Sequence, residues 1–223
     1  MQGVTAINAI SFKYKNGVIA AIDTGSCYGS TRMSNSQRIF MPTNNCVVLF
    51  AGILSDIEFL KKFIRQELDS EEYRTMDPQG IHKMIQRILY QKRSEGVPLP
   101  VQVVVCGVNQ KQNTVFDSTD SKGRFIGAIN SKGNFWFESS VALSFSAHLS
   151  LPMLRNFDCE LLEKEDAIKL AEECFRVLCY KDCRATNGIQ LAIIETTGVT
   201  IGEPYCVNTD WMIGLREDEV LLQ

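Results

Sequence analysis

Few side chains in this sequence have the types and spacings that enzymes use for chemistry. The 223 residues contain no GxSxG elbow for a serine nucleophile, no HExxH pair for zinc, and no GxxxxGKS or GxxxxGKT loop for phosphate. A thiol nucleophile needs a neighbouring base, and no basic residue stands beside Cys27 in the sequence. These residues alone therefore indicate no independent active site.

The eight cysteines carry neither a disulfide signature nor a zinc signature. They lie in apolar stretches without a CxxC pair, which is typical of small buried hydrophobes in a reducing compartment. Cys179 and Cys183 are spaced to share a helix face, but His82 and His148 are the only histidines that could complete a zinc site. We therefore expect no metal and no cofactor.

The bulk composition excludes several classes of partner. A net charge of −3 disfavours a general attraction to nucleic acid or to anionic lipid. The longest apolar runs fall far short of the ~20 residues of a membrane-spanning helix. The first residues lack the pattern of a secretion signal, so we expect the chain to stay inside the cell.

The first elements that the pattern predicts are strands. Ile10, Phe12 and Tyr14 alternate with polar residues, and Asn16-Gly17 favours a tight hairpin before a return strand at 18–23. That return strand is apolar at nearly every position, which indicates a sheet covered on both faces. Short strands are expected at 38–41 and 46–51.

Helices and a second block of strands follow. Ser55 and Glu58 form a capping box before an apolar helical stripe, and Asp77-Pro78 is typical of a second helix start. The remaining elements are predicted as strands at 101–105, 115–116, 124–129 and 135–137, helices at 147–157 and 164–183, and a hairpin at 189–201.

This order of elements favours an α+β fold in which two sheets are stacked between two helical layers. No linker, repeat or low-complexity tract divides the chain. We therefore expect a single domain at 1–213 and a C-terminal tail at 214–223, whose last residues are apolar enough to dock on a neighbour.

Five segments carry a resemblance to a known family. They are GVIAAID at 17–23, SCYGS at 26–30, YQKRS at 90–94, RVLCYKD at 176–182 and NTDW at 208–211. In this order and at these separations they resemble the beta subunits of the 20S proteasome, and most closely the eukaryotic seventh beta type. The resemblance implies a four-layer αββα sandwich of the N-terminal nucleophile hydrolase type.

The same resemblance implies a chemistry that this chain lacks. Active members of the family expose a threonine by self-cleavage after a glycine, and its hydroxyl then attacks a peptide carbonyl. Aligned without a gap, the threonine position falls on Ile7 and the glycine position on Ala6. Isoleucine has no hydroxyl, so we expect a non-catalytic subunit that is not itself an enzyme.

Other positions of the family's site are present in altered form. Asp23 and Asp182 match family aspartates, whereas Arg38 stands where active members keep a lysine and Ala185 where they keep a serine. Because a guanidinium does not give up its proton, Arg38 can anchor a carboxylate but cannot tune a base. The resemblance thus implies a vestigial site at Ile7, Asp23, Arg38 and Asp182.

One alternative is an active threonine hydrolase that uses Thr5 after atypical processing. Val4 precedes Thr5 where a glycine is needed, and a shift of two residues moves the hydroxyl roughly 6–7 Å along an extended strand. A second alternative is a free-standing binding domain that has the same fold.

The resemblance also implies partners and a location. We expect neighbouring beta subunits in the same ring, alpha-ring subunits, and beta subunits of the opposite ring, which the tail at 214–223 could reach. A cytoplasmic and nuclear location is expected, without nucleic acid or membrane as a partner. Side faces that differ from each other would prevent a useful ring of identical copies.

Overall fold

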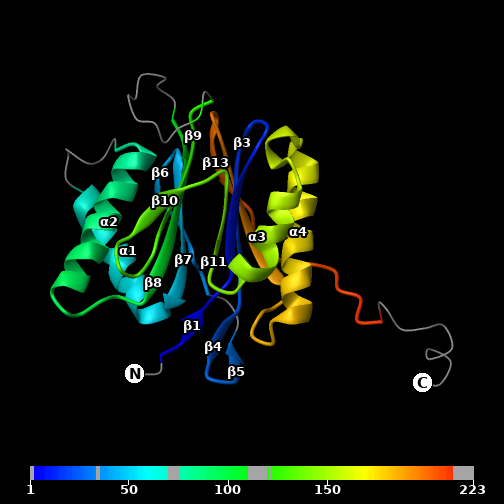
Figure 1. Cartoon of the computed structure of the whole chain (residues 1–223), viewed down its shortest axis with the longest axis horizontal. Coiled ribbons are helices and arrows are strands. Elements are labelled where there is room, and N and C mark those ends of the chain that lie inside the picture. The colour runs from blue at the N-terminus through cyan, green and yellow to red at the C-terminus, as the bar shows by residue number, and fades with distance from the viewer. Residues whose placement is uncertain (1–2, 34–35, 70–75, 110–119, 121, 213–223) are drawn as a thin grey trace.

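In the described part of this chain, two antiparallel sheets lie face to face between two pairs of helices (Figure 1). The computed structural model describes residues 3–33, 36–69, 76–109, 120 and 122–212. The order of the layers is helices, sheet, sheet, helices. The structure thus confirms the α+β class and the four-layer αββα sandwich.

The larger sheet is built around long buried strands from the first half of the chain. Its strands run in the order β10 (Phe135–Phe137), β9 (Arg124–Ile129), β8 (Val101–Val108), β7 (Cys46–Ile53), β1 (Thr5–Ala6), β4 (Ser26–Tyr28) and β5 (Thr31–Met33), with β6 (Ile39–Thr43) paired to β7. The short strand β1 brings the N-terminal segment into the middle of this sheet.

The smaller sheet contains the predicted N-terminal hairpin. Its order is β11 (Ser140–Leu143), β2 (Ala9–Tyr14), β3 (Gly17–Asp23), β12 (Gly188–Glu195) and β13 (Gly198–Ile201), with β14 (Tyr205–Cys206) paired to β12. Every residue of β3 is buried. The strand is central and covered on both faces, as its unbroken apolar run predicts.

Each pair of helices covers the outer face of one sheet (Figure 1). The helices α1 (Leu54–Leu68) and α2 (Pro78–Ser94) pack on the larger sheet, whereas α3 (Ser146–Asn156) and α4 (Lys164–Lys181) pack on the smaller one. A short 3₁₀ helix, η1 (Cys159–Leu161), follows α3. No helix in the described part of the chain is long and apolar enough to cross a membrane.

The hydrophobic core has three layers because both faces of both sheets are covered. Side chains such as Val18 and Val104 fill the space between the sheets. Ile57 and Ile85 pack from α1 and α2 on one outside, and Phe175 packs from α4 on the other. Burial of this apolar surface is the main force that stacks the four layers.

The predicted capping box at Ser55 is wrong in detail. The helix α1 begins at Leu54 directly after β7, and its N-cap residue, Ile53, makes no side-chain cap. The amide of Leu54 instead donates to the carbonyl oxygen of Val4 at 2.9 Å. The predicted cap of α2 is confirmed, since Asp77 accepts a hydrogen bond from the Gly80 amide at 2.7 Å.

The role predicted for Gly17 in the hairpin turn is also wrong. The turn lies at residues 15–16, and Gly17 is the first residue of β3. A Cβ atom at Gly17 would lie 2.1 Å from the carbonyl oxygen of Ile194, so glycine is needed here for the close approach of β12.

Two predictions fall outside the residues that the structure describes. The strand at 115–116 lies in the range 110–119, and the boundary between a domain at 1–213 and a tail at 214–223 lies in the range 213–223. The strand and the division into domain and tail therefore stay predictions.

Candidate functional site

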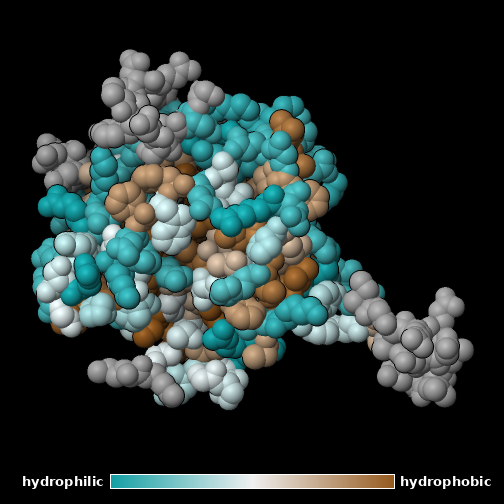
Figure 2. Space-filling model, in the orientation of Figure 1, coloured by the Kyte–Doolittle hydropathy of each residue, from teal (hydrophilic) through white to brown (hydrophobic). Residues whose placement is uncertain are grey.

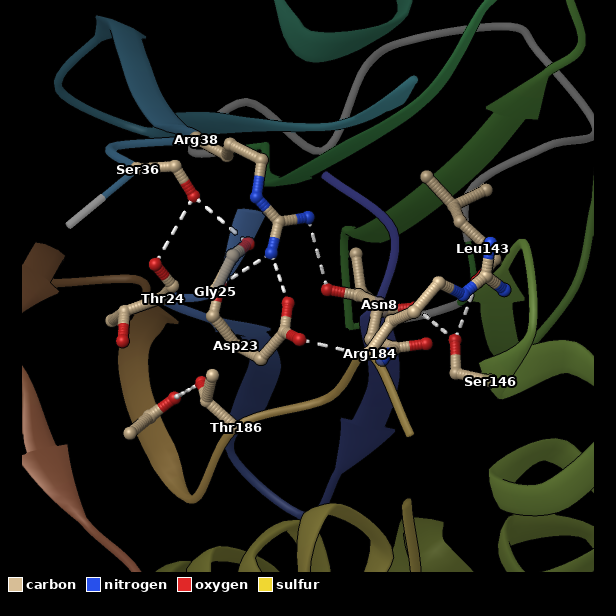
Figure 3. A network of polar contacts seen from close by, with 12 residues as sticks. Asn8, Asp23, Thr24, Gly25, Ser36, Arg38, Leu143, Ser146, Arg184 and Thr186 are labelled. Carbon is tan, nitrogen blue, oxygen red and sulfur yellow. Dashed lines mark hydrogen bonds and ion pairs between the residues drawn. The ribbon is translucent and has the colours of Figure 1, made fainter. Parts of the chain in front are cut away.

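The fold brings three of the predicted site residues together at the edge where the two sheets meet the end of α4. Asp23 is the last residue of β3, Arg38 immediately precedes β6, and Asp182 follows the last residue of α4. All three side chains are buried and contact one further residue, Asn8. Figure 3 shows Asn8 between the sheets with Asp23 and Arg38. These four residues form a buried cluster, which we call the Arg38 network.

Arg38 is saturated by acceptors on its two terminal nitrogens. Its Nη2 atom donates to a carboxylate oxygen and to the carbonyl oxygen of Asp23. Its Nη1 atom donates to the carbonyl oxygens of Asn8 at 3.1 Å and Phe50 at 3.2 Å. Arg38 therefore ties the end of β3 to β7 and to the residue before β2, and none of its contacts moves a proton.

Asn8 is a site residue that the sequence analysis missed. Its Nδ2 atom lies 3.3 Å from Oδ2 of Asp23 and 3.4 Å from Oδ2 of Asp182, so one neutral amide donates to two carboxylates. The side chain is fully buried. A polar residue directly before an apolar strand was the available signal, and buried polar groups usually have partners.

Burial raises the pKa of the Asp23 carboxyl, and the neighbouring Arg38 charge and the bonds from Asn8 and Arg38 oppose that rise. Burial likewise lowers the pKa of the Arg38 guanidinium. The two groups compensate each other's loss of water. The Asn8 Oδ1 and Arg38 Nε atoms are buried and have no hydrogen-bond partner among the described residues.

Asp182 also has a local role at the end of α4. Its Oδ1 atom accepts a hydrogen bond from the Arg184 amide at 3.0 Å and lies 3.5 Å from Nε of the same residue. Its carbonyl oxygen accepts from the Ala185 amide at 3.0 Å. Asp182 therefore fixes the turn that leads from α4 towards β12.

Ile7, the predicted nucleophile position, presents only hydrocarbon. It is 8% exposed and lines a hollow of about 350 Å³ together with Ala6, Gly52 and Arg184. The hydroxyls that share this hollow belong to Thr5, Ser131 and Ser144. None of these hydroxyls has a hydrogen bond to a basic side chain among the described residues.

The residues before Ile7 are built into the larger sheet. In β1, Thr5 pairs with Ile53 of β7 on one side and with Cys27 of β4 on the other, and Ala6 pairs with Gly52. In the unprocessed chain residue 7 therefore has a peptide nitrogen, whereas the mechanism that the resemblance implies uses a free amine there.

The two other candidate nucleophiles lie in unfavourable surroundings. The Thr5 hydroxyl donates to the carbonyl oxygen of Cys27 at 3.3 Å, and it makes no described contact with the carboxylates of the Arg38 network. Burial raises the pKa of the Cys27 thiol, so less of it is thiolate at neutral pH. Both groups donate hydrogen bonds to backbone carbonyl oxygens, Thr5 to that of Cys27 and Cys27 to that of Arg184.

The residues considered for a metal do not come together. Cys179 is half-buried and Cys183 is exposed, and the described residues contain no cluster of three or more histidine, cysteine, aspartate or glutamate side chains that could hold an ion. His82 packs among Phe125, Phe135 and Phe137, and burial lowers its pKa to about 4.

Comparison with known proteins identifies the family. A model of the family described as "Proteasome subunit" matches residues 4–194. The "Probable proteasome subunit beta type-7" of Encephalitozoon cuniculi is 39% identical over 99% of this chain and 98% of that relative. The "Proteasome subunit beta type-4" of Arabidopsis thaliana is 30% identical over 93% of this chain and 82% of its own length.

A third relative, the "Proteasome subunit beta type-7" of Saccharomyces cerevisiae, is 30% identical over 93% of this chain and 80% of its own length. The relatives thus include both type-7 and type-4 names, but all three are beta subunits. With the two-sheet fold, these matches show that the chain belongs to the proteasome subunit family, as one of its beta subunits.

Proposed function

We propose that this chain is a non-catalytic beta subunit of the 20S proteasome core, of the seventh type. It forms part of an inner ring and of the wall of the degradation chamber, in a complex whose peptide-bond hydrolysis is done by other subunits. The observation that carries this proposal is the side chain at residue 7, a buried isoleucine without any atom that could attack a carbonyl.

The backbone around residue 7 supports the same function. The pairing of Thr5 and Ala6 with β4 and β7 keeps the preceding residues in the sheet, so release of an N-terminal amine at residue 7 would remove a strand. Ala6 also replaces the glycine after which active relatives are cleaved. The self-cleavage step of activation thus lacks its glycine, in addition to the missing nucleophile.

The Arg38 network supports a structural function for the remaining site residues. An arginine keeps its charge at all physiological pH values and presents a fixed fork of donors. Arg38 uses that fork on Asp23, Asn8 and Phe50, which belong to separate parts of the two sheets. We infer that the ancestral charge pair now holds the sheets together.

The seventh type is favoured by the relative with the highest identity among those named above, which is called a type-7 subunit and matches almost end to end. On this proposal the partners are neighbouring beta subunits of the same ring, alpha-ring subunits and beta subunits of the opposite ring. The location would be the cytoplasm and the nucleus, where such particles work.

Intact mass and active-site labelling of the assembled particle test the proposal. We expect a tagged chain to co-migrate with a large particle, to keep the residues before Ile7, and to stay unlabelled by a threonine-directed inhibitor. The catalytic subunits of the same particle provide the positive control for labelling. A mature mass that begins at Thr5 or Ile7 would contradict the proposal.

The variant Ile7→Thr sharpens this test. A hydroxyl alone lacks the preceding glycine and the lysine that Arg38 replaces, so we expect the variant to remain uncleaved and unlabelled in the particle. A labelled Ile7→Thr chain would show that the rest of the site is still competent. That result would overturn the structural function assigned to the Arg38 network.

A further inference from the structure

A second hollow, of about 300 Å³, lies where the turn between β10 and β11 meets the end of α3. Its floor is apolar, because Leu154 and Cys159 line it and are buried. Its rim includes Phe157, whose side chain is 55% exposed. This hollow shares no lining residue with the one around Ile7, so it is a separate site.

Exposed apolar residues adjoin the lining of this second hollow along the chain. Phe137 of β10 precedes Glu138 and is 41% exposed, and Leu161 of η1 follows Glu160 and is 72% exposed. Figure 2 shows apolar side chains among polar ones on the face that carries β10 and α3. Exposed aromatic and aliphatic groups that gather on one face are typical of surfaces that bind another protein.

The charged groups of the hollow are mostly acidic. Those that line it are Glu138, Arg155, Asp158 and Glu160. Arg155 pairs with Glu138 at 2.8 Å, and Glu160 is held by Ser139 at 2.7 Å and by Arg124 at 2.6 Å.

Asp158 differs from these neighbours because its side chain has no hydrogen bond or ion pair with any described residue. It is exposed and precedes η1 without capping it. One free carboxylate thus lines the same hollow as an exposed phenylalanine and two buried apolar residues, Leu154 and Cys159. A cation with an aliphatic stem would satisfy both, because its stem can cover the ring while its charge meets the carboxylate.

The geometry points to a docking site for a lysine or arginine side chain from a neighbouring protein chain, with its stem against Phe157 and its charge against Asp158. This inference rests on the proposed function, because an assembled particle supplies the neighbouring chain. The exposed side chains of Phe137 and Leu161 would be covered by the same neighbour.

A charge reversal tests this docking site in the full chain. Tagged wild-type and Asp158→Lys chains are expressed in the cells of origin, and the fraction of each in the large particle is measured on native gels. We expect a several-fold lower fraction for Asp158→Lys, because it places a cation against the basic partner. Asp158 is exposed and unbonded, so the substitution leaves the fold intact.

The matched control is Glu203→Lys, which makes the same charge change at an exposed residue outside the hollow. We expect its incorporation to stay within twofold of wild type. If Asp158→Lys is incorporated as well as the control, the docking site is wrong, and the proposed function stands as long as the wild-type chain is in the particle. If the wild-type chain migrates alone, both are wrong.

Photo-crosslinking identifies the occupant. With a benzoylphenylalanine at residue 157 of the assembled chain, we expect a crosslinked peptide from another subunit that contains a lysine or arginine near the attachment point. A crosslinked peptide without a basic residue would overturn the assignment, as would an assembled particle in which residue 157 crosslinks to no other chain.

Discussion

Two arginines are buried among the described residues, and they hold the sheets together at different places in different ways. Arg38 is fully buried, and the carboxylate that it binds, Asp23, is 1% exposed. Arg124 is 3% exposed, but its carboxylate partners Asp120 and Glu160 have side chains that are 22% and 39% exposed.

Arg124 uses all three of its nitrogens. Its Nε atom lies 2.6 Å from Asp120, its Nη2 atom lies 2.6 Å from Glu160, and its Nη1 atom donates to the carbonyl oxygen of Tyr14 at 2.5 Å. Arg124 thereby joins β9 of the larger sheet to β2 of the smaller sheet and to η1. We call this set the Arg124 network.

The difference between the networks lies in what happens when the arginine is lost. Asp23 has no route to water, so its charge would be left buried and without a counter-charge. Asp120 and Glu160 reach solvent and can be hydrated instead. The comparison teaches that the position of the carboxylate, more than that of the arginine, decides the energetic cost of breaking the pair.

The largest effect is expected for Arg38→Met. This substitution keeps much of the side-chain volume but leaves the Asp23 charge stranded, so we expect a loss of about 3–5 kcal/mol in the free energy of unfolding. The midpoint of urea unfolding of the purified chain measures it. If the single variant does not fold, its solubility relative to the double variant below provides the comparison.

The control for this prediction is the double variant Arg38→Met/Asp23→Asn. Removal of the stranded charge should recover part of the lost stability, so the double variant should be more stable than Arg38→Met alone. A double variant that is less stable than Arg38→Met would show that the Asp23 carboxylate is not stranded in the single variant, because the hydrogen bond that it accepts from Asn8 would then contribute more than the missing counter-charge costs.

A smaller effect is expected for Arg124→Met. The variant loses charge-assisted hydrogen bonds, but Asp120 and Glu160 regain water, so we expect a loss of about 1–3 kcal/mol. The same urea titration measures it. Equal losses for Arg38→Met and Arg124→Met would mean that exposure of the partner carboxylate does not matter, which would break the comparison.

The smallest effect concerns pH. Burial raises the pKa of Asp120, but the bonds from Arg124 and the Lys13 charge outweigh it and hold that pKa below its ordinary value of 3.8. The pKa of Glu160 lies below its ordinary value of 4.5, chiefly because Ser139 donates a hydrogen bond to it. Burial opposes this shift, and the hydrogen bond and charge of Arg124 add to it. The stability that each group contributes is therefore fully present above its ordinary pKa, 3.8 for Asp120 and 4.5 for Glu160, and is lost as the pH falls below that value through the lower pKa of the folded state.

The contribution of Asp23 to the pH dependence of stability has the opposite sign. A carboxyl whose pKa is raised by folding stabilises the folded state more at low pH. We expect Asp120→Asn/Glu160→Gln to flatten the loss of stability on acidification by about 1 kcal/mol or less, since both groups reach solvent. Asp23→Asn should leave that slope in place or make it steeper. Urea midpoints between pH 3 and pH 6 test this, and a slope flattened only by Asp23→Asn would contradict it.

Several elements could be predicted from the sequence because their signals are local. The run at 18–23 was recognised as a strand covered on both faces, and Asp77-Pro78 marked the start of α2 to the residue. The turn residues before Gly17 and the start of α1 were predicted less well. In both places a distant backbone, that of Ile194 or of Val4, decides the local geometry.

The site could be predicted only in part for the same reason. The resemblance selected Asp23, Arg38 and Asp182, and the fold brings them together, but that Ile7 occupies the place of a nucleophile stays a prediction. Asn8 was missed because it makes sense only beside its partners. Arg124 was not singled out, since nothing near it in the sequence indicates burial.

The sequence by itself determined the order and type of the four helices and the longer strands, and the absence of a hydroxyl or thiol at residue 7, because these follow from residue types and short-range periodicity. It did not indicate the short strands β1, β4, β5, β11 and β14. Only the tertiary structure decided that Asn8 would join Asp23 to Asp182, a residue 174 positions away, and that the segment before Ile7 would fill a place in the larger sheet. Such contacts arise when buried layers exclude water and force distant polar groups to pair with each other, which no local pattern encodes.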